Sequence, residues 1–142
     1  MPIKLYAAPQ SLYSGRARSY LIKAGLDYRE QPFNTAHFRE IVLPKAGGRQ
    51  GLPTIELEDG TVIRDGAAII DYFEAQNGHA FSPRTPKQRV LSRLFDVIGA
   101  EGLLRPAMHY RWNFDELNVD FLRFYFETLM PEGRKDRAES VV

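Results

Sequence analysis

The chain has 142 residues, of which 44% are hydrophobic, 12% aromatic and 26% charged, a composition that excludes a collagen-like, low-complexity or wholly disordered protein. Nineteen lysines and arginines balance eighteen aspartates and glutamates, and no basic stretch stands clear of acidic neighbours, so no nucleic-acid partner is expected. The absence of cysteine excludes disulfides, thiolate zinc sites and a thiol nucleophile of the protein itself.

The first half of the chain alternates the sequence signals of strands and helices. In chain order we expect a strand at 3–8, a helix from about Ser14 to a stop at Gly25, a strand at 26–33, a weak helix at 37–43 ended by Pro44, strands at 54–57 and 61–63, and a helix from Asp65 to Asn77. Asp59-Gly60 lies between the last two strands and is a strong hairpin signal, so that pair should be antiparallel. The order β-α-β-α-β-β-α predicts a mixed sheet with helices on its faces.

The second half of the chain carries helical signals only. Residues 78–84 predict a linker, and 85–142 predict two helices followed by a charged tail. The signals are a capping box from Thr85 to Gln88 with Pro86 at the first helical position, a break or kink at Pro106, a second cap formed by Asn113 with Glu116, and a stop at Pro131. These helices carry more large apolar side chains than they can bury against each other. Further chain, a partner subunit or the first domain should therefore cover them.

Two motifs stand out against this order of elements. One is Leu52-Pro53-Thr54 at the start of the third strand, and the other is Val62-Ile63-Arg64-Asp65-Gly66-Ala67-Ala68-Ile69-Ile70-Asp71-Tyr72. Together with the element order, they resemble a glutathione S-transferase over nearly the full chain. The resemblance implies that 1–77 form a thioredoxin-like, glutathione-binding α/β domain. It also implies that 85–142 hold the first two helices of the family's α-helical C-terminal domain, which normally continues.

The resemblance places part of the glutathione site around Pro53. In the family this proline is cis, and Leu52 would then offer its backbone N–H and C=O to the cysteinyl part of glutathione. A trans proline that only marks the start of a strand is the alternative. Arg49 and Gln50, in the loop before the proline, would bind the glycyl carboxylate, for which the arginine fork is well suited. Arg49 could instead be simply solvated.

A second part of the implied site lies at the start of the third helix. Asp65 would hold the ammonium of the γ-glutamyl group, while backbone N–H groups of the helix start hold its carboxylate. Asp65 could also serve only as a helix cap. Family members usually carry Glu or Gln followed by Ser or Thr here. Asp65 is one methylene shorter, and Gly66 lacks the hydroxyl, so one hydrogen bond worth about 1 kcal/mol is missing.

The residue that activates glutathione is the third part of the site. Glutathione reacts as its thiolate, and a free thiol with a pKa near ~8.5 is only about 3% ionised at pH 7. A hydroxyl donor and a helix N-terminus can lower that pKa. The loop after the first strand is similar to the Ser-x-x-x-x-Arg-x-Arg pattern of serine-type classes, which places the active serine at Ser11. Ser14 is the second candidate, although it could instead be the N-cap of the first helix, and Tyr6 and Tyr13 remain further candidates.

The activity that the resemblance implies is transfer of the glutathione sulfur to a small electrophilic molecule, with glutathione as co-substrate and a homodimer as the working form. Four side chains of the second domain are possible contributors to the electrophile pocket: Met108, His109, Arg111 and Trp112. The alternative is a non-catalytic binding or scaffolding module on the same fold. The short Asp65, the missing hydroxyl at Gly66 and the small second domain favour that alternative.

Other classes of function find no support in the sequence. His37, His79 and His109 fall in different elements without metal-ligand spacing, so no metal is expected. There is no nucleophile elbow, P-loop or dinucleotide fingerprint. No apolar segment approaches the length of a membrane span and no signal peptide is recognisable, so we expect a cytoplasmic protein without a membrane partner.

Overall fold

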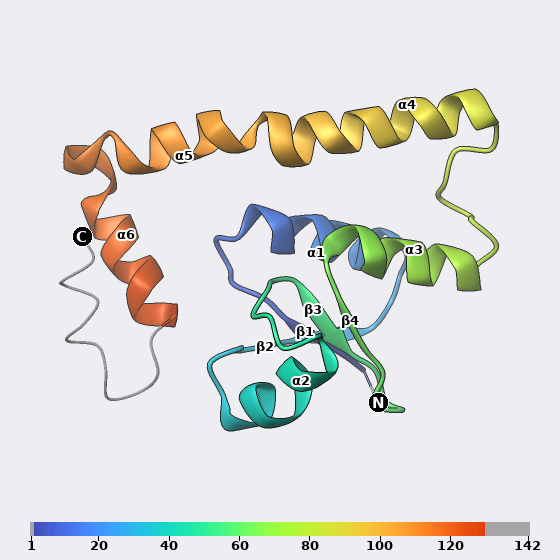
Figure 1. The fold of residues 1–142 in the computed structure, drawn as a ribbon, viewed down its shortest axis with the longest axis horizontal. Coiled ribbons are helices and arrows are strands. Elements are labelled where there is room, and N and C mark those ends of the chain that lie inside the picture. The colour runs from blue at the N-terminus through green and yellow to red at the C-terminus, as the bar shows by residue number, and fades with distance from the viewer. Residues whose placement is uncertain (1, 130–142) are drawn as a thin grey trace. The chain divides into compact units, whose positions relative to one another are not determined.

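The computed structural model describes residues 2–129, and the chain divides into two compact units, Met1–Gly78 and His79–Val142 (Figure 1). Each unit is described by itself below. Within the described residues, no helix has both the length and the apolar character needed to cross a membrane.

The first unit is a mixed four-stranded sheet with helices on both faces (Figure 1). Its elements are β1 (Ile3–Tyr6), α1 (Leu12–Lys23), β2 (Tyr28–Gln31), a π-helical turn η1 (Phe38–Val42), α2 (Leu43–Lys45), β3 (Thr54–Glu56), β4 (Val62–Arg64) and α3 (Gly66–Gln76). The strand order is β2-β1-β3-β4, with β1 parallel to β2 and antiparallel to β3. Strands β3 and β4 form the expected antiparallel hairpin. This is the predicted thioredoxin-like α/β domain.

The two faces of the sheet follow from the alternation of side chains along β1. Leu5 belongs to the main core, where it joins buried residues of α1 and α3 such as Leu21 and Ile69. Tyr6 belongs to the opposite face and packs against Phe38 of η1, with ring centres 5.0 Å apart. Helices α1 and α3 therefore cover one face of the sheet, and η1 with α2 covers the other (Figure 1).

The ends of the helices in this unit differ in part from the expectation. Helix α1 begins one turn early, because its N-cap is Ser11 and not Ser14. It ends as predicted before Gly25, whose φ of +66° suits a residue without a side chain. Pro44 does not end the second helical segment. The helical run through η1 and α2 continues past it by one residue, to Lys45, and is followed by Gly47 and Gly48 with positive φ.

The second unit is helical over its described part. It contains α4 (Pro86–Val97), a π-helical turn η2 (Ile98–Gly102), α5 (Leu104–Trp112) and α6 (Asp115–Leu129). The capping box of Thr85 and Gln88 is present at the start of α4. The break expected at Pro106 is present but lies a few residues earlier, at η2, and Pro106 itself lies in the first turn of α5, where it needs no N–H partner.

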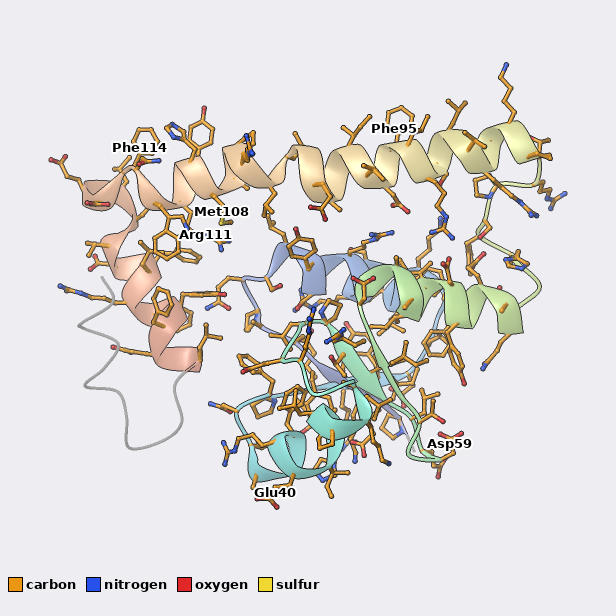
Figure 2. All side chains as sticks on the ribbon, viewed as in Figure 1. Glu40, Asp59, Phe95, Met108, Arg111 and Phe114 are labelled. Carbon is orange, nitrogen blue, oxygen red and sulfur yellow. The ribbon has the colours of Figure 1, made fainter. Side chains whose placement is uncertain are left out.

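The second expected cap is also misplaced. Asn113 ends α5 instead of opening α6, and its side-chain amide donates to the carbonyl oxygen of His109 at 3.2 Å. Large apolar side chains of α4, which the sequence predicted to be covered, are exposed among the described residues. Phe95, for example, is 71% exposed and projects from the helix (Figure 2).

Candidate functional site

A pocket of about 320 Å³ opens at the edge of the first unit, where the turn before β3 meets the residues before α3. Its lining residues are Arg49, Gln50, Gly51, Leu52, Arg64 and Asp65. Four of these, Arg49, Gln50, Leu52 and Asp65, are residues that the sequence analysis assigned to glutathione. The structure therefore brings together two parts of the site that lie some fifteen positions apart in the chain.

The turn that forms one wall of the pocket is held by specific hydrogen bonds. The Leu52–Pro53 peptide bond is cis. The buried hydroxyl of Thr54 donates to the carbonyl oxygen of Gly51 at 2.8 Å, and the backbone N–H of Asp65 donates to the carbonyl oxygen of Pro53 at 3.0 Å. Within the described residues, the N–H and C=O of Leu52 make no hydrogen bond. They are available to pair with an extended peptide-like ligand.

Asp65 caps α3 and also lines the pocket. Its Oδ1 accepts hydrogen bonds from the backbone N–H of Ala67 at 2.7 Å and of Ala68 at 3.4 Å. Its Oδ2 accepts none from the part of the chain that the structure describes. Its φ of 85° lies in the left-handed region, which is uncommon for a residue with a side chain and is found preferentially at functional sites. The capping role is thus observed, and one carboxylate oxygen remains for a ligand.

Gly66 marks the point where three segments meet. A Cβ placed on it would lie 3.5 Å from Cδ of Arg16, 3.7 Å from the carbonyl oxygen of Tyr13 and 3.8 Å from Cγ of Pro53. The first turn of α1, the proline turn and the start of α3 therefore converge. This convergence connects the loop that carries Ser11 with the pocket.

Ser11 and Ser14 have different environments. The Oγ of Ser11 accepts the backbone N–H of Ser14 at 3.2 Å, and its O–H has no acceptor among the described residues. Ser11 is half-buried, so a ligand can reach it. Ser14 is fully buried, and its Oγ accepts the backbone N–H of Ala8 at 3.4 Å. Only Ser11 combines access with a hydroxyl proton that is free to donate.

The two tyrosine candidates differ as well. Tyr6 is 2% exposed, and its hydroxyl donates to Oε2 of Glu56 at 2.8 Å. Burial raises the pKa of Tyr6 well above its usual value, and the hydrogen bond to Glu56 raises it further. This hydroxyl is engaged inside the domain. Tyr13 is 38% exposed and contributes its backbone carbonyl to the convergence at Gly66.

The partner of Tyr6, Glu56, is a buried carboxylate at the centre of a polar cluster on the η1 face of the sheet, and the side chains of Lys4 and His37 in this cluster are 43% and 47% exposed. Nζ of Lys4 donates to its Oε2 at 3.1 Å, and Nε2 of His37 lies 3.0 Å from the same oxygen. Burial by itself would raise the pKa of this carboxyl group. The hydrogen bonds from His37, Tyr6 and Lys4 outweigh it and hold the pKa of Glu56 below its usual value. Because this cluster satisfies its own charge, it serves the fold and not the pocket.

Two lining residues, Arg64 and Gly51, were missed by the sequence analysis. Arg64 lies opposite Thr54 in the β3–β4 ladder, and its Nη1 donates to the carbonyl oxygen of Arg49 at 3.1 Å. A Cβ on Gly51 would lie 3.1 Å from Cδ of Arg64. The register of the β3–β4 hairpin could have identified both residues. Thr54 directly follows Pro53, so the residue opposite Thr54, which is Arg64, must lie beside the proline turn and its Gly51.

The side chains proposed for the electrophile pocket all lie on α5. Arg111 points toward α6 (Figure 2), where its guanidinium carbon lies 5.6 Å from the ring centre of Tyr125. Trp112 packs near Phe126 with ring centres 6.0 Å apart. Met108 is half-buried and His109 is exposed. Among the described residues, no group of three or more His, Cys, Asp or Glu side chains could hold a metal ion.

Known proteins support the assignment of the fold. The family model described as "Glutathione S-transferase, N-terminal domain" matches residues 5–84, which is more than half of the chain. No curated protein matches the sequence. A possible glutathione S-transferase from Rhodopseudomonas palustris is similar in structure, with a TM-score of 0.58 and 20% identity over 99% of this chain and 69% of that one.

Two further solved structures are similar to this chain. A glutathione transferase homolog from Sulfitobacter, solved with bound glutathione, has a TM-score of 0.59 and 18% identity, covering 98% of this chain and 62% of that one. Glutathione S-transferase-I bound with lactoylglutathione has a TM-score of 0.61 and 18% identity, covering 91% of this chain and 66% of that one. This chain thus spans between 62% and 69% of the length of these three solved chains. The family model and the shared fold together show that the chain belongs to the glutathione S-transferase family.

Proposed function

We propose that the chain binds glutathione in the pocket beside Pro53 and transfers its sulfur to a small electrophile. The observation that carries the proposal is the convergence at Gly66, which joins the pocket to the start of α1. The two structural relatives that were solved with bound glutathione or lactoylglutathione have the same fold and are consistent with such a ligand.

The charges of the pocket match those of glutathione. Glutathione has two carboxylates and one ammonium group, and the pocket wall carries two arginines and one aspartate. The free Oδ2 of Asp65 suits the ammonium, and the first N–H groups of α3 suit the neighbouring carboxylate because of the helix dipole. The unpaired backbone of Leu52 suits the cysteinyl segment. Such an arrangement would place the thiol toward the start of α1.

We propose Ser11 as the group that stabilises the thiolate. Its hydroxyl already accepts a backbone N–H of α1, so its proton is left to donate to the sulfur. The first turn of α1 contains no acidic residue, so the positive end of the helix dipole is not offset there. A lowering of the thiol pKa by ~2 units, about 2.7 kcal/mol, would make the thiol mostly ionised at pH 7.

The reaction that follows uses the sulfur lone pair. The thiol proton passes to solvent when the thiolate forms. The thiolate lone pair then forms a carbon–sulfur bond with the electrophilic carbon, and the bond from that carbon to its leaving group breaks, so that an aryl halide releases halide with the bonding electron pair. Homodimer formation and a cytoplasmic location are further parts of the proposal. The exposed apolar side chains of α4, such as Phe95, are consistent with a covering partner.

The proposal is tested by calorimetric titration of the chain with glutathione, followed by an assay with an activated aryl halide as electrophile. Saturable binding together with a rate above the uncatalysed background supports the proposal. Binding of glutathione without a rate above the background supports the alternative, a binding module on the same fold. The specific observation in favour of this alternative is Gly66, which lacks the hydroxyl that family members usually carry. Absence of binding contradicts the proposal.

A further inference from the structure

The pocket wall before β3 is the end of a longer segment that lies on the η1 face of the sheet. Residues 36–45 form one continuous helical run through η1 and α2, and residues 46–53 lead from the end of this run into β3. We propose that His37, in the first turn of the run, is a positioning residue for the pocket wall, because its bond to Glu56 of β3 fixes how the run lies on the sheet. The inference goes beyond the proposed function, and only one of its readouts, the affinity for glutathione, rests on that function.

The cluster around Glu56 does not line the pocket, but His37 connects it to the segment that does. Nε2 of His37 lies 3.0 Å from Oε2 and 3.2 Å from Oε1 of Glu56. Hydrogen bonds hold the pKa of Glu56 below its usual value, so the carboxylate is ionised at pH 7 and can only accept. Nε2 therefore carries a proton and donates it to this bond, whether or not the ring is charged. Because the carboxylate is only 8% exposed, the bond is stronger than one between two fully solvated groups.

This bond joins the two elements between which the pocket wall lies. Residues 46–53 begin at the end of the helical run and end at β3, so the position of the run relative to β3 sets the path of this stretch of chain. In the last turn of the run, Nζ of Lys45 donates to the carbonyl oxygen of Gly60, in the turn of the β3–β4 hairpin, at 2.9 Å. The helical run is thus held to the same hairpin at both of its ends, and a helix held at two points has little freedom to tilt.

The stretch between the helical run and Arg49 has little packing of its own. Gly47 and Gly48 are exposed and have positive φ, and a Cβ on either would meet no atom within 4 Å. Beyond them, Arg49 is tied to the hairpin, because Nη1 of Arg64 donates to its carbonyl oxygen at 3.1 Å. A segment with few buried contacts takes the conformation that its two ends impose. The end that depends on His37 is the helical run.

Lys4 provides a control that has the same partner. Its Nζ donates to the same Oε2 of Glu56 at 3.1 Å, and its side chain is about as exposed as that of His37. Lys4 lies on β1, however, directly opposite Glu56 in the ladder of the sheet. Its bond to Glu56 joins two strands that already pair through their backbones. Loss of either side chain should therefore cost stability, but only loss of His37 should release the pocket wall.

The test compares His37→Leu and Lys4→Met in the full chain. Amide hydrogen exchange of Ala46 and Gly48, whose N–H groups both donate to carbonyl oxygens of the helical run at 2.9 Å, reports opening of this segment without any ligand. Calorimetry reports the affinity for glutathione. We expect His37→Leu to speed exchange at these two amides about threefold to tenfold and to weaken glutathione binding by a similar factor, because the binding-competent state is less populated. Lys4→Met should leave both quantities within about twofold of the unaltered chain.

Two further readouts separate positioning from a general loss of stability. The amide nitrogen of glutamine can take the place of Nε2 and donate to Glu56, so His37→Gln should recover most of the protection from exchange and most of the affinity. The thiol pKa of bound glutathione, measured by ultraviolet absorbance, should be the same in all of these variants, since the proposed thiolate contact is Ser11 at the start of α1.

Unchanged exchange at Ala46 and Gly48 in His37→Leu overturns the inference. A loss of affinity in Lys4→Met as large as that in His37→Leu overturns it as well, since the effect would then reflect stability alone, and so does a shifted thiol pKa in His37→Leu. If His37→Leu does not fold, His37→Asn, whose amide is too short to reach Glu56, carries the same comparison. If the unaltered chain does not bind glutathione, the proposed function fails, and the exchange comparison still decides the role of His37.

Discussion

Asp65 donates its backbone N–H to the carbonyl oxygen of Pro53 at 3.0 Å, and this bond ties the start of α3 to the proline turn. The residues on either side, Thr54 and Arg64, are paired in the β3–β4 ladder. Two short segments far apart in sequence are thus held as one rigid wall. A ligand that contacts both segments meets a site that is already formed, so little of its binding energy is spent on ordering the protein.

Replacement of Ser11 by alanine tests the thiolate contact. We expect Ser11→Ala to raise the thiol pKa of bound glutathione by ~1–2 units, because the hydroxyl donor is lost. It should also lower the free energy of unfolding by about 0.5–2 kcal/mol, because Ser11 is the N-cap of α1. Ultraviolet absorbance of the bound thiolate against pH, and denaturant unfolding, measure the two effects.

Ser14→Ala is the control for that variant. Ser14 is fully buried and accepts the N–H of Ala8, so its removal should destabilise the protein without moving the thiol pKa. If Ser14→Ala shifts the thiol pKa and Ser11→Ala does not, the roles of the two serines are reversed.

Adding a hydroxyl at Gly66 should strengthen glutathione binding. A Cβ at this position meets its neighbours at 3.5–3.8 Å, which is ordinary contact distance, so Gly66→Ser should fold normally. One new hydrogen bond to the ligand's γ-glutamyl carboxylate is worth about 1 kcal/mol, or about fivefold in affinity. Gly66→Ala is the matched control, since it adds the Cβ without the hydroxyl. Equal affinities of the serine and alanine variants for glutathione, measured by calorimetry, would show that the hydroxyl makes no contact.

Asp65→Asn separates the charge of Asp65 from its capping role. Asparagine is as good an N-cap as aspartate and tolerates a positive φ, so the free energy of unfolding should change by less than about 0.5 kcal/mol. Glutathione affinity should fall about tenfold or more, because the ammonium loses its counter-charge. Calorimetry and denaturant unfolding on the same sample check both values. Unchanged affinity would leave Asp65 with its capping role alone.

The polar cluster around the buried Glu56 should make stability depend on acid pH. Its hydrogen bonds hold the pKa of Glu56 below its usual value of 4.5, so the cluster stabilises the fold above that pH and loses this contribution as the pH falls below it. Glu56→Gln should therefore lower the free energy of unfolding at pH 7 by about 1–3 kcal/mol. The difference from the unaltered chain should shrink as the pH falls through 4.5 toward the folded-state pKa of Glu56.

Denaturant unfolding measured at several pH values tests this dependence. Tyr6→Phe removes one hydrogen bond to Glu56 but leaves Lys4 and His37 in place, so its effect should be smaller. A Glu56→Gln effect that stays constant from pH 7 down to strongly acid pH would contradict the account of this cluster.

The sequence predicts most of the first unit because its signals are local. Asp59-Gly60 between two short apolar strands specifies a hairpin, and Gly25 marks the end of α1 by its left-handed backbone. The prolines that were used as stops are less informative, and one of them, Pro131, lies outside the described residues. The helical segment continues one residue past Pro44, and the break expected at Pro106 comes a few residues before it, at η2.

The pocket is harder to predict because it depends on register. Arg49 and Asp65 could be assigned from their places in motifs. Arg64 belongs to neither assignment, since its place in the pocket depends on which residue it faces across the hairpin, and it was missed because the register of the hairpin was not worked out. The roles of Ser11 and Ser14 also depend on the structure and not on residue type alone. Both fit an N-cap by residue type, and a shift of three residues in the start of α1 decides which one is buried.

The most direct test of the central claim is the ultraviolet absorbance of the glutathione thiolate, titrated against pH in the presence of saturating chain. The account predicts a bound thiol pKa of about 6.5, some 2 units below that of free glutathione, and a return toward the free value in Ser11→Ala. A bound thiol pKa equal to that of free glutathione would contradict the claim that this site activates the thiol.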